Sequence, residues 1–335
     1  MSTQTINEMI NFGLGLASGS LAPTSTETNL DFVVENLLFT YRGAFSASET
    51  GLSGTINGIE IYNDSTQLAQ IDDLDADLAT FGTLAQSDNP IRALVYLLRE
   101  DDVYRGSDAA DRFFVFDGDD RAYGRGGDDI IYGGRGEDRI FGGSGSDKMF
   151  GDGGADIMFG RSGNDVLFGG AAGDTIKGNG GNDRLVGKTG GDDLFGGSAN
   201  DRLSGGGGRD QLFGGSGNDK IDGGVAKDIL TGGRGADAFI FDDGDSGTGR
   251  LKRDVITDFG RGGDELNLRR IDADTGDRGN DAFIFTGQTA AAHAVWYDVK
   301  GDDVMVMGDT DGDGRADFRI QLLDINSMSI DDFIF

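Results

Sequence analysis

Apolar and polar positions repeat every nine residues through the middle of this chain. Fifteen consecutive units run from Gly106 to Ile240 without an insertion or a deletion. Each unit has Asp at its sixth position and an apolar residue at its eighth, in the pattern G-G-x-G-x-D-x-U-x, where U is apolar. A nonapeptide period sustained over so many units predicts a repeat architecture in which the units stack on one another.

The glycines in each unit decide which element it forms. Glycine at the first, second and fourth positions disfavours a helix, whereas the short stretch around the apolar residue suits a brief strand. We therefore expect each unit to be a glycine-rich turn followed by a short strand. One such unit buries almost nothing, so neighbouring units must stack into a solenoid with a shared core. The predicted fold class is all-β.

The repeated units resemble those of the RTX (repeat-in-toxin, haemolysin-type) proteins, as in GGRGEDRIF from Gly133 and GGSGNDKID from Gly214. Rolls of that family are parallel and bind calcium, with two nonapeptides in each right-handed turn. The resemblance implies two ladders of aspartates spaced eighteen residues apart, with Ca²⁺ held between successive loops by carboxylates and backbone carbonyls. About thirteen ions would fit, all hard cations with oxygen ligands. The implied ligands are Asp111, Asp120, Asp129, Asp138, Asp147, Asp156, Asp165, Asp174, Asp183, Asp192, Asp201, Asp210, Asp219, Asp228 and Asp237.

Some units depart from the pattern, and we expect weaker calcium binding there. The unit that starts at Val115 lacks both leading glycines. Alanine replaces the glycine of the fourth position at Ala109, Ala172, Ala199 and Ala226.

Composition supports a fold that depends on calcium. The formal net charge is -30 and there is no cysteine, so disulfides do not stabilise this protein. Closely spaced carboxylates repel one another, and the many glycines add an entropic cost to folding. About thirteen divalent ions would nearly cancel the net charge. We therefore expect the metal-free repeats not to fold.

The chain after residue 240 resembles the C-terminal domain of the serralysin-type secreted metalloproteases. The segments that carry this resemblance are DVITDFGRGGDELNL from Asp254, DAFIFTG from Asp281 and the terminal DDFIF. In that family this region caps the roll and bears an uncleaved signal for type I secretion. The resemblance implies a β-rich cap over residues 241–335 and a secretion signal at its end.

A second candidate metal site lies inside the expected cap. Asp309, Asp311 and Asp313 alternate and are followed by Gly314, which matches the start of an EF-hand-like calcium loop. The twelfth position is Ile320 rather than Glu, so Asp317 would have to complete a different geometry. The alternative is an acidic turn between two strands.

The first 105 residues predict a small β-rich domain. Leu37, Phe39 and Tyr41 alternate like a strand with one buried face, as do Ile59 and Ile61. An amphipathic helix is expected after Asn89 and Pro90, where it would cover the open end of the solenoid. The turns between the strands are assigned to the glycines at Gly43, Gly51, Gly54 and Gly58.

Several functions are excluded by what the sequence lacks. The single histidine, His293, rules out an H-E-x-x-H zinc protease; no G-x-S-x-G motif or cysteine nucleophile is present. The acidic composition argues against nucleic acid. No apolar run is long enough to span a membrane, and the first 22 residues lack the basic residues of a signal peptide.

The leading hypothesis is a secreted, extracellular calcium-binding protein with a structural or interaction role. It would leave the cell unfolded through the type I secretion machinery and fold on meeting calcium outside. The alternative is an extracellular enzyme that acts on polymers through an unrecognised catalytic N-terminal domain. Membrane insertion and ice binding are weaker alternatives, because the chain has neither a long apolar segment nor a regular threonine row. The sequence names no surface ligand, polymer substrate or oligomeric state.

Overall fold

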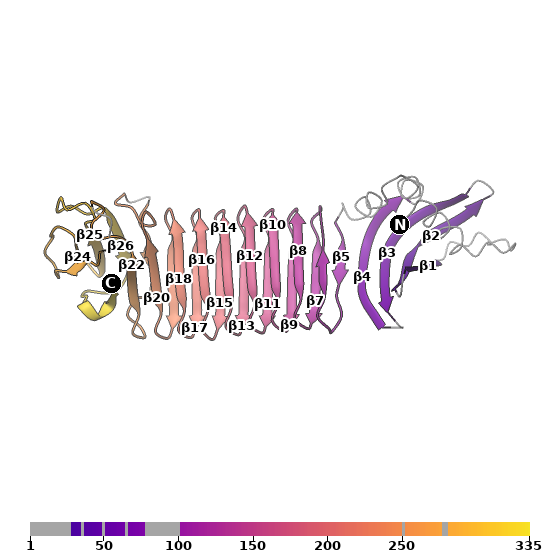
Figure 1. Ribbon diagram of the computed structural model, residues 1–335, viewed down its shortest axis with the longest axis horizontal. Helices are drawn as coiled ribbons and strands as arrows, with labels where there is room; N and C mark the ends of the chain where they lie inside the picture. Colours follow the sequence, from indigo (N-terminus) through magenta and orange to yellow (C-terminus); the bar gives the residue numbers. More distant parts are fainter. Residues whose placement is uncertain are drawn as a thin grey trace.

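The computed structural model describes residues 28–34, 37–48, 51–63, 66–77, 101–249, 252–276 and 281–335. The repeats form a parallel β-solenoid in which successive strands alternate between two sheets, and Figure 1 shows its length. We name the two layers by their strand numbers. The odd-strand sheet contains β5 (Val103–Arg105), β7 (Arg121–Gly126), β9 (Arg139–Ser144), β11 (Ile157–Ser162), β13 (Thr175–Gly180), β15 (Asp193–Ser198), β17 (Gln211–Ser216) and β19 (Ile229–Arg234). The even-strand sheet contains β6 (Arg112–Phe114), β8 (Ile130–Arg135), β10 (Lys148–Gly153), β12 (Val166–Ala171), β14 (Arg184–Thr189), β16 (Arg202–Gly207), β18 (Lys220–Val225) and β20 (Ala238–Asp242).

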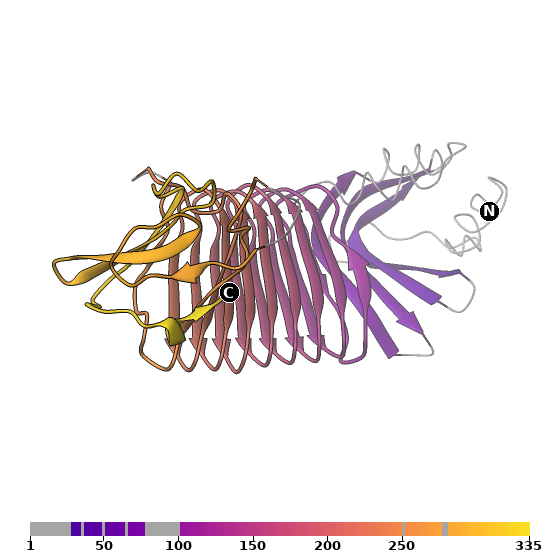
Figure 2. The same ribbon diagram turned by 60° about the vertical axis from the view of Figure 1, so that its left-hand side comes forward.

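Two repeats make one turn of the solenoid, so strands pair in parallel with a register of eighteen residues. Met149 of β10 lies opposite Ile131 and Leu167 of its two neighbours, and every repeat strand follows the same rule. Figure 2 shows these stacked rungs with turns along both edges. The register places equivalent residues of the repeat directly above one another, which is why one sequence pattern serves all of them.

The apolar residues at the eighth positions fill the space between the two sheets. From Ala122 to Phe239, each of them is at most 2% exposed. Outward-facing residues alternate with them, as the strand period of two requires. Each repeat strand therefore contributes one eighth-position side chain to the core, and the core extends along the whole roll.

The cap begins by continuing both sheets. β21 (Val255–Ile256) pairs in parallel with β19, and β22 (Glu265–Arg270) pairs in parallel with β20. Beyond them lie β23 (Ile284–Phe285), then an antiparallel meander of β24 (Ala294–Lys300), β25 (Asp303–Gly308) and β26 (Phe318–Leu322). A 3-10 turn, η1 (Ile330–Asp332), leads into β27 (Phe333–Ile334), which pairs with β22. The C-terminus thus completes the edge of the even-strand sheet.

The N-terminal strands form an antiparallel meander: β1 (Thr28–Val34), β2 (Leu37–Ser48), β3 (Gly51–Asn63) and β4 (Thr66–Asp77). β4 pairs with β5, the first strand of the solenoid. The strands expected around Leu37 and Ile59 are confirmed. The turns predicted at three of the glycines are wrong. Gly43, Gly54 and Gly58 lie within strands, and the strand pairing shifts register beside Gly43 and Gly58. A glycine can mark a bulge as readily as a turn.

The predicted all-β parallel roll is confirmed. In the described part of the chain the only helical element is η1, and none of its helices is long and apolar enough to cross a membrane. The helix expected after Asn89 lies outside the described residues. The division at residues 105 and 240 stays a prediction, although the pairing of β5 with β7 extends the solenoid to before residue 106.

Candidate metal centre

The conserved position of aspartate in the repeat sets where the carboxylates gather. Each sixth-position Asp immediately precedes a strand, so the turns place one row of carboxylates along each edge of the roll. From Asp120 to Asp237 these aspartates are at most 2% exposed. Burial of so many ionisable side chains without cationic partners requires an explanation, because an unpaired buried charge is costly.

One oxygen of each carboxylate joins the rungs together. The backbone N–H of Asp147 donates to Oδ1 of Asp165 at 2.8 Å, and the N–H of Asp165 donates to Oδ1 of Asp183 at 2.8 Å. The same bond recurs along both rows at 2.8–2.9 Å, from Asp111 to Asp237. These bonds hold each carboxylate in a fixed orientation between two turns.

The other oxygen is buried without a hydrogen-bond partner. This holds for Oδ2 of fourteen of the fifteen repeat aspartates; in Asp111, by contrast, Oδ2 accepts from the backbone N–H and the hydroxyl of Ser107. Buried carboxylate oxygens in proteins are ordinarily hydrogen-bonded. Fourteen equivalent exceptions in two regular rows indicate that the same missing group satisfies each of them.

The glycine at the first position of each repeat keeps open the space beside this oxygen. A Cβ added to Gly160 would lie 2.2 Å from Oδ2 of Asp165 and 2.9 Å from the carbonyl oxygen of Gly178. The first-position glycines of the other repeats show the same close approach to their own aspartates, from 2.2 to 2.7 Å. A carboxylate oxygen and a backbone carbonyl oxygen therefore converge where any side chain would intrude.

Burial raises the pKa of these carboxyl groups. It raises the pKa of Asp120, Asp156 and Asp228 to about 8, against the backbone hydrogen bond that each accepts, and neighbouring aspartates add to the rise. Burial also raises the pKa of Asp165 and of Asp174 to about 7. Burial therefore favours the protonated form of these carboxyl groups when no cation is bound.

Two rows extend further than the repeats do. The N–H of Asp228 donates to Oδ1 of Asp254 at 2.8 Å, and that of Asp237 donates to Oδ1 of Asp264 at 3.0 Å. At the other end, Asp102 donates its N–H to Oδ1 of Asp120. Sequence reasoning missed these three residues. Each starts an Asp-x-apolar triplet that could have revealed it, although Asp254 and Asp264 follow insertions that break the nine-residue period.

The departures from the repeat pattern carry a visible backbone cost. Ala172, Ala199 and Ala226 adopt φ values of 78°, 77° and 103°, a region that favours glycine. Val115 is fully buried and places a branched side chain where other repeats have glycine. The weaker calcium binding expected at these units stays a prediction.

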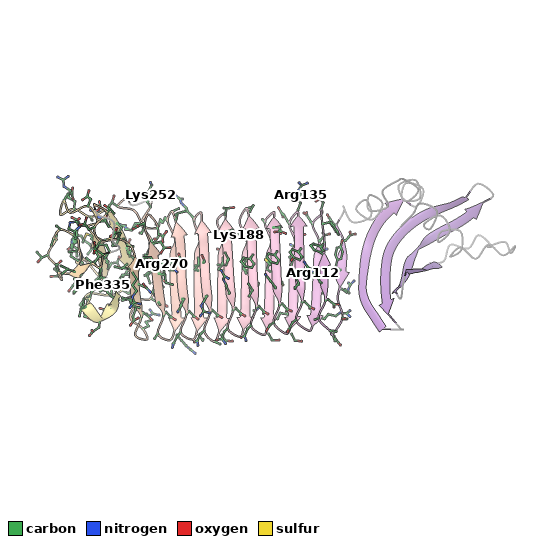
Figure 3. The ribbon with its side chains drawn as sticks, viewed as in Figure 1. Arg112, Arg135, Lys188, Lys252, Arg270 and Phe335 are labelled. Atoms are coloured by element: carbon green, nitrogen blue, oxygen red, sulfur yellow. The ribbon has the colours of Figure 1, made fainter. Side chains whose placement is uncertain are left out.

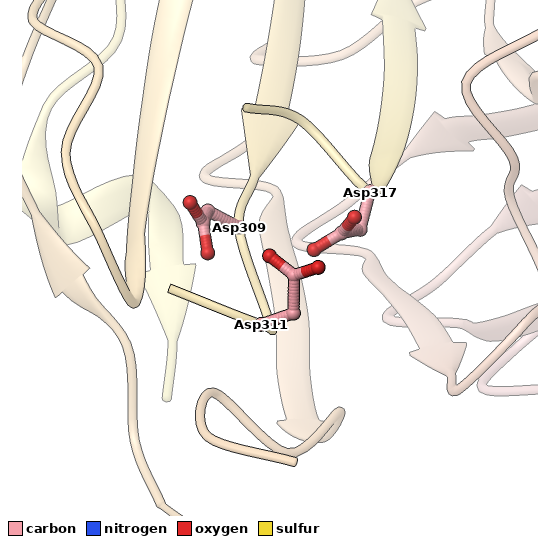
Figure 4. A group of neighbouring side chains, drawn as sticks. All are labelled: Asp309, Asp311 and Asp317. Atoms are coloured by element: carbon pink, nitrogen blue, oxygen red, sulfur yellow. The ribbon is translucent and has the colours of Figure 1, made fainter. Parts of the chain in front are cut away.

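In the cap, the structure brings together three of the four predicted ligands. Oxygens of Asp309, Asp311 and Asp317 lie within 4.8 Å of one another (Figure 4). Asp313 is not part of this group, and its carboxylate lies 3.9 Å from Arg315. Asp309 is fully buried and accepts from the backbone N–H groups of the following loop, whereas Asp311 and Asp317 are exposed.

The residues present fit a hard divalent cation. Both rows and the cap group offer carboxylate oxygens, and the rows add backbone carbonyl oxygens, the ligand types that Ca²⁺ takes. The rows also lack lysine or arginine partners for Oδ2. A cation beside each Oδ2 would satisfy its missing interaction and offset the repulsion between rungs.

The match to a family model agrees with this reading of the repeats. The family model of the RTX calcium-binding nonapeptide repeat (four copies) matches eight segments between residues 99 and 246. No curated protein matches the chain. Two similar solved structures are the AlgE6R3 and AlgE6R2 subunits of the mannuronan C5-epimerase of Azotobacter vinelandii. Their identities are 28% and 27% and their TM-scores 0.32 and 0.30; the matches cover 43% and 41% of this chain and 77% and 86% of those chains.

A third similar structure is the extracellular lipase LipA from Serratia marcescens, at 18% identity and a TM-score of 0.22. That match covers 62% of this chain and 40% of the lipase. The repeat pattern, the parallel roll and the paired rows of buried carboxylates thus coincide with the segments that the family model matches. Residues 99–246 of this chain are RTX calcium-binding nonapeptide repeats.

Proposed function

We propose that this protein is a secreted, extracellular calcium-binding protein that folds when its carboxylate rows bind Ca²⁺. The observation that carries the proposal is the array of fourteen buried Oδ2 atoms without a hydrogen-bond partner. The ligands would be the fifteen repeat aspartates together with neighbouring turn carbonyls. Asp254 and Asp264 would extend the rows, and Asp309, Asp311 and Asp317 would hold a further ion in the cap.

The same array explains why folding would depend on calcium. In the unfolded chain these carboxylates are hydrated and far apart, whereas the roll buries them eighteen residues apart on adjacent rungs. Each buried anion without a partner opposes folding. Bound Ca²⁺ supplies the positive charge and the missing oxygen contacts, so its binding free energy becomes folding free energy. At calcium near ten times the dissociation constant, each site would contribute about 1.4 kcal/mol.

Export before folding fits the position of the C-terminal segment. Phe333 is 8% exposed and packs against Phe285 and Phe335, with ring centroids 5.2 and 5.4 Å apart. A signal in this segment would be accessible only while the chain is unfolded. Low cytosolic calcium would keep the chain unfolded and the signal accessible. The type I secretion machinery would then bind the signal during export.

Circular dichroism of the full-length chain tests this function. We expect a cooperative gain of β-sheet signal as calcium rises from excess chelator to millimolar concentration, and little gain with magnesium, which tolerates flexible, water-poor oxygen sites less well. Equal β-sheet signal in calcium and in chelator would contradict the proposal. Calcium counted in the folded protein by equilibrium dialysis then tests the expectation of about thirteen ions in the repeats, together with those held by Asp254, Asp264 and the cap group.

A further inference from the structure

The cap contains a hollow of about 430 Å³ on the outer face of its antiparallel meander. Met305 and Met307 of β25 line it, because they alternate with the buried residues of that strand. Arg319 of β26 and Arg253, which precedes β21, line it as well. Figure 3 labels Lys252, the residue before Arg253, near the junction of the roll and the cap. A hollow of this volume suits a small molecule rather than a polymer.

Two arginines lie side by side in this hollow. The register in which β21 pairs with β26, continued by two residues, places Arg253 beside Arg319. The buried Ser246 joins their segments at this point, because its hydroxyl donates to the carbonyl oxygen of Arg319 at 2.6 Å and accepts from the N–H of Asp254 at 3.0 Å. Both arginines are half-buried, so water screens their mutual repulsion less than it would on an open surface.

The surroundings orient one guanidinium group and leave a donor of the other unused. Nη2 of Arg253 donates to Oε1 of Gln321 at 3.1 Å, and Nε2 of Gln321 donates to Oδ2 of Asp303 at 2.9 Å. Nε of Arg319 is buried and, among the described residues, has no hydrogen-bond partner. Buried donors in proteins ordinarily have an acceptor. The Nε donor of Arg319 therefore indicates a missing acceptor, just as the Oδ2 atoms of the rows indicate a missing cation.

The charge of the lining indicates the sign of the missing group. Three basic side chains and one acidic side chain line the hollow, and the acidic one, Asp298, forms an ion pair with Lys300. This lining would repel a cation and attract an anion, the opposite of the carboxylate rows. The two methionines offer apolar surface beside the arginines, which suits a ligand with an apolar part next to its charged group.

We propose that this hollow binds a small organic anion that combines one carboxylate or phosphate group with an apolar body. The oxyanion would accept hydrogen bonds from Nε of Arg319 and from the guanidinium group of Arg253, in the planar pairs that arginine offers. It would also relieve the repulsion between the two arginines. The apolar body would pack on Met305 and Met307, whose flexible side chains adapt to varied shapes. None of these residues belongs to the carboxylate rows or to the cap group, so the site is separate from the proposed calcium ligands.

Equilibrium dialysis of the calcium-loaded, full-length protein tests the proposal with four probes. 2-Naphthoate and 2-naphthyl phosphate carry both parts of the proposed ligand, 2-naphthol lacks the negative charge at neutral pH, and acetate lacks the apolar body. The first two should each bind at a single site, and the tighter of them identifies the preferred oxyanion. 2-Naphthol and acetate should each bind at least about tenfold more weakly, because either the charge-assisted hydrogen bonds or the apolar contacts are missing.

Paired variants locate the site. Arg319→Gln removes the guanidinium group with the buried Nε and should weaken 2-naphthoate binding at least about tenfold. Arg261→Gln removes the same charge from an exposed residue of the cap outside the hollow, and it should bind like the parent protein. Arg319→Lys keeps the charge without the planar donor pair, so it should retain only part of the affinity. Circular dichroism in calcium checks that each variant folds.

The proposal is overturned if neither naphthyl anion binds, if 2-naphthol binds as tightly as 2-naphthoate, or if Arg261→Gln loses as much affinity as Arg319→Gln. The last result would mean that the anion responds to net charge or to bound calcium rather than to this hollow. Calcium-induced folding, followed by circular dichroism without the probes, reports separately on the calcium function.

Discussion

The backbone N–H of Asp165 donates a 2.8 Å hydrogen bond to Oδ1 of Asp183, the residue one full turn later in the roll. Oδ2 of Asp183 is left buried with no hydrogen-bond partner. The carboxylate is therefore held rigidly by one oxygen and presents the other. The same arrangement is repeated along both edges, and it supports the proposal that the two rows bind cations.

Replacing Asp183 by Asn should weaken calcium-induced folding. The amide keeps an oxygen that can accept the rung hydrogen bond but loses the negative charge, so about one site's contribution of 1.4 kcal/mol is removed. The calcium midpoint in circular dichroism should rise. Asp193→Asn is the matched control, since Asp193 faces outward and its Oδ1 accepts from Gln211 instead. An equal shift in both variants would show that net charge, not the row, controls folding.

Gly160→Ala should destabilise the calcium-loaded roll by about 2–3 kcal/mol, because its Cβ would overlap Oδ2 of Asp165. Gly153→Ala serves as the control: the nearest atom to its Cβ is 3.6 Å away, and its φ is not in the glycine region. That change should be neutral or stabilising by up to about 1 kcal/mol. Urea unfolding in saturating calcium measures both, and similar losses would argue against the open space beside Oδ2.

Low pH should partly substitute for calcium in stabilising the folded roll. The pKa of Asp156 is raised to about 8 by burial, far above its value of 3.8 in an unfolded chain. A raised pKa in the folded state contributes stability that is present below pH 4 and is lost as pH rises through 8. In calcium-free buffer the protein should therefore hold more β-sheet at pH 5 than at pH 8.

Asp156→Asn identifies the cause of this pH dependence. The variant cannot titrate at that position, so its calcium-free stability should change less between pH 5 and pH 8 than that of the parent protein. General relief of charge repulsion would leave the pH dependence the same in both. In saturating calcium the direction reverses, because protons compete with the metal for the carboxylates.

Asp311→Asn should remove one bound calcium ion from the cap, and Asp313→Asn should remove none. Both residues are exposed, and each accepts one backbone hydrogen bond from the residue two positions later. Only Asp311 belongs to the group of converging carboxylates. Equilibrium dialysis against calcium compares the two, and loss of an ion in the Asp313 variant would restore the EF-hand-like ligand order that the sequence suggests.

Phe333→Ala should lower stability by about 3–5 kcal/mol, because it empties a buried position at the end of the even-strand sheet. Ile330→Ala, at a side chain that is 51% exposed, should change it by less than about 0.5 kcal/mol. Chemical unfolding in calcium measures both. If the Phe333 variant were as stable as the parent, the C-terminal strand would not be part of the folded cap.

The repeat pattern predicted a solenoid in which the apolar residue at the eighth position of each unit is buried. The resemblance to the RTX repeats added the two units per turn, and the structure confirms the resulting stack of Ile131, Met149 and Leu167. Where the period stops, local pattern was a poorer guide. The turns assigned to Gly43 and Gly58 were wrong, because a glycine in a long strand and a glycine in a turn look alike when the partner strand is unknown.

The sequence by itself determined the solenoid, its apolar core and the residue type along both edges, because all three follow from a periodicity that needs no distant contact. Only the tertiary structure decided what lies next to each carboxylate. It showed that Oδ2 faces a first-position glycine, that Asp254 and Asp264 prolong the rows across insertions, and that Asp317 rather than Asp313 joins Asp309. The contact between glycine and Oδ2 depends on how each turn folds, and the other two relationships join residues whose spacing follows no period, so only the folded chain shows them.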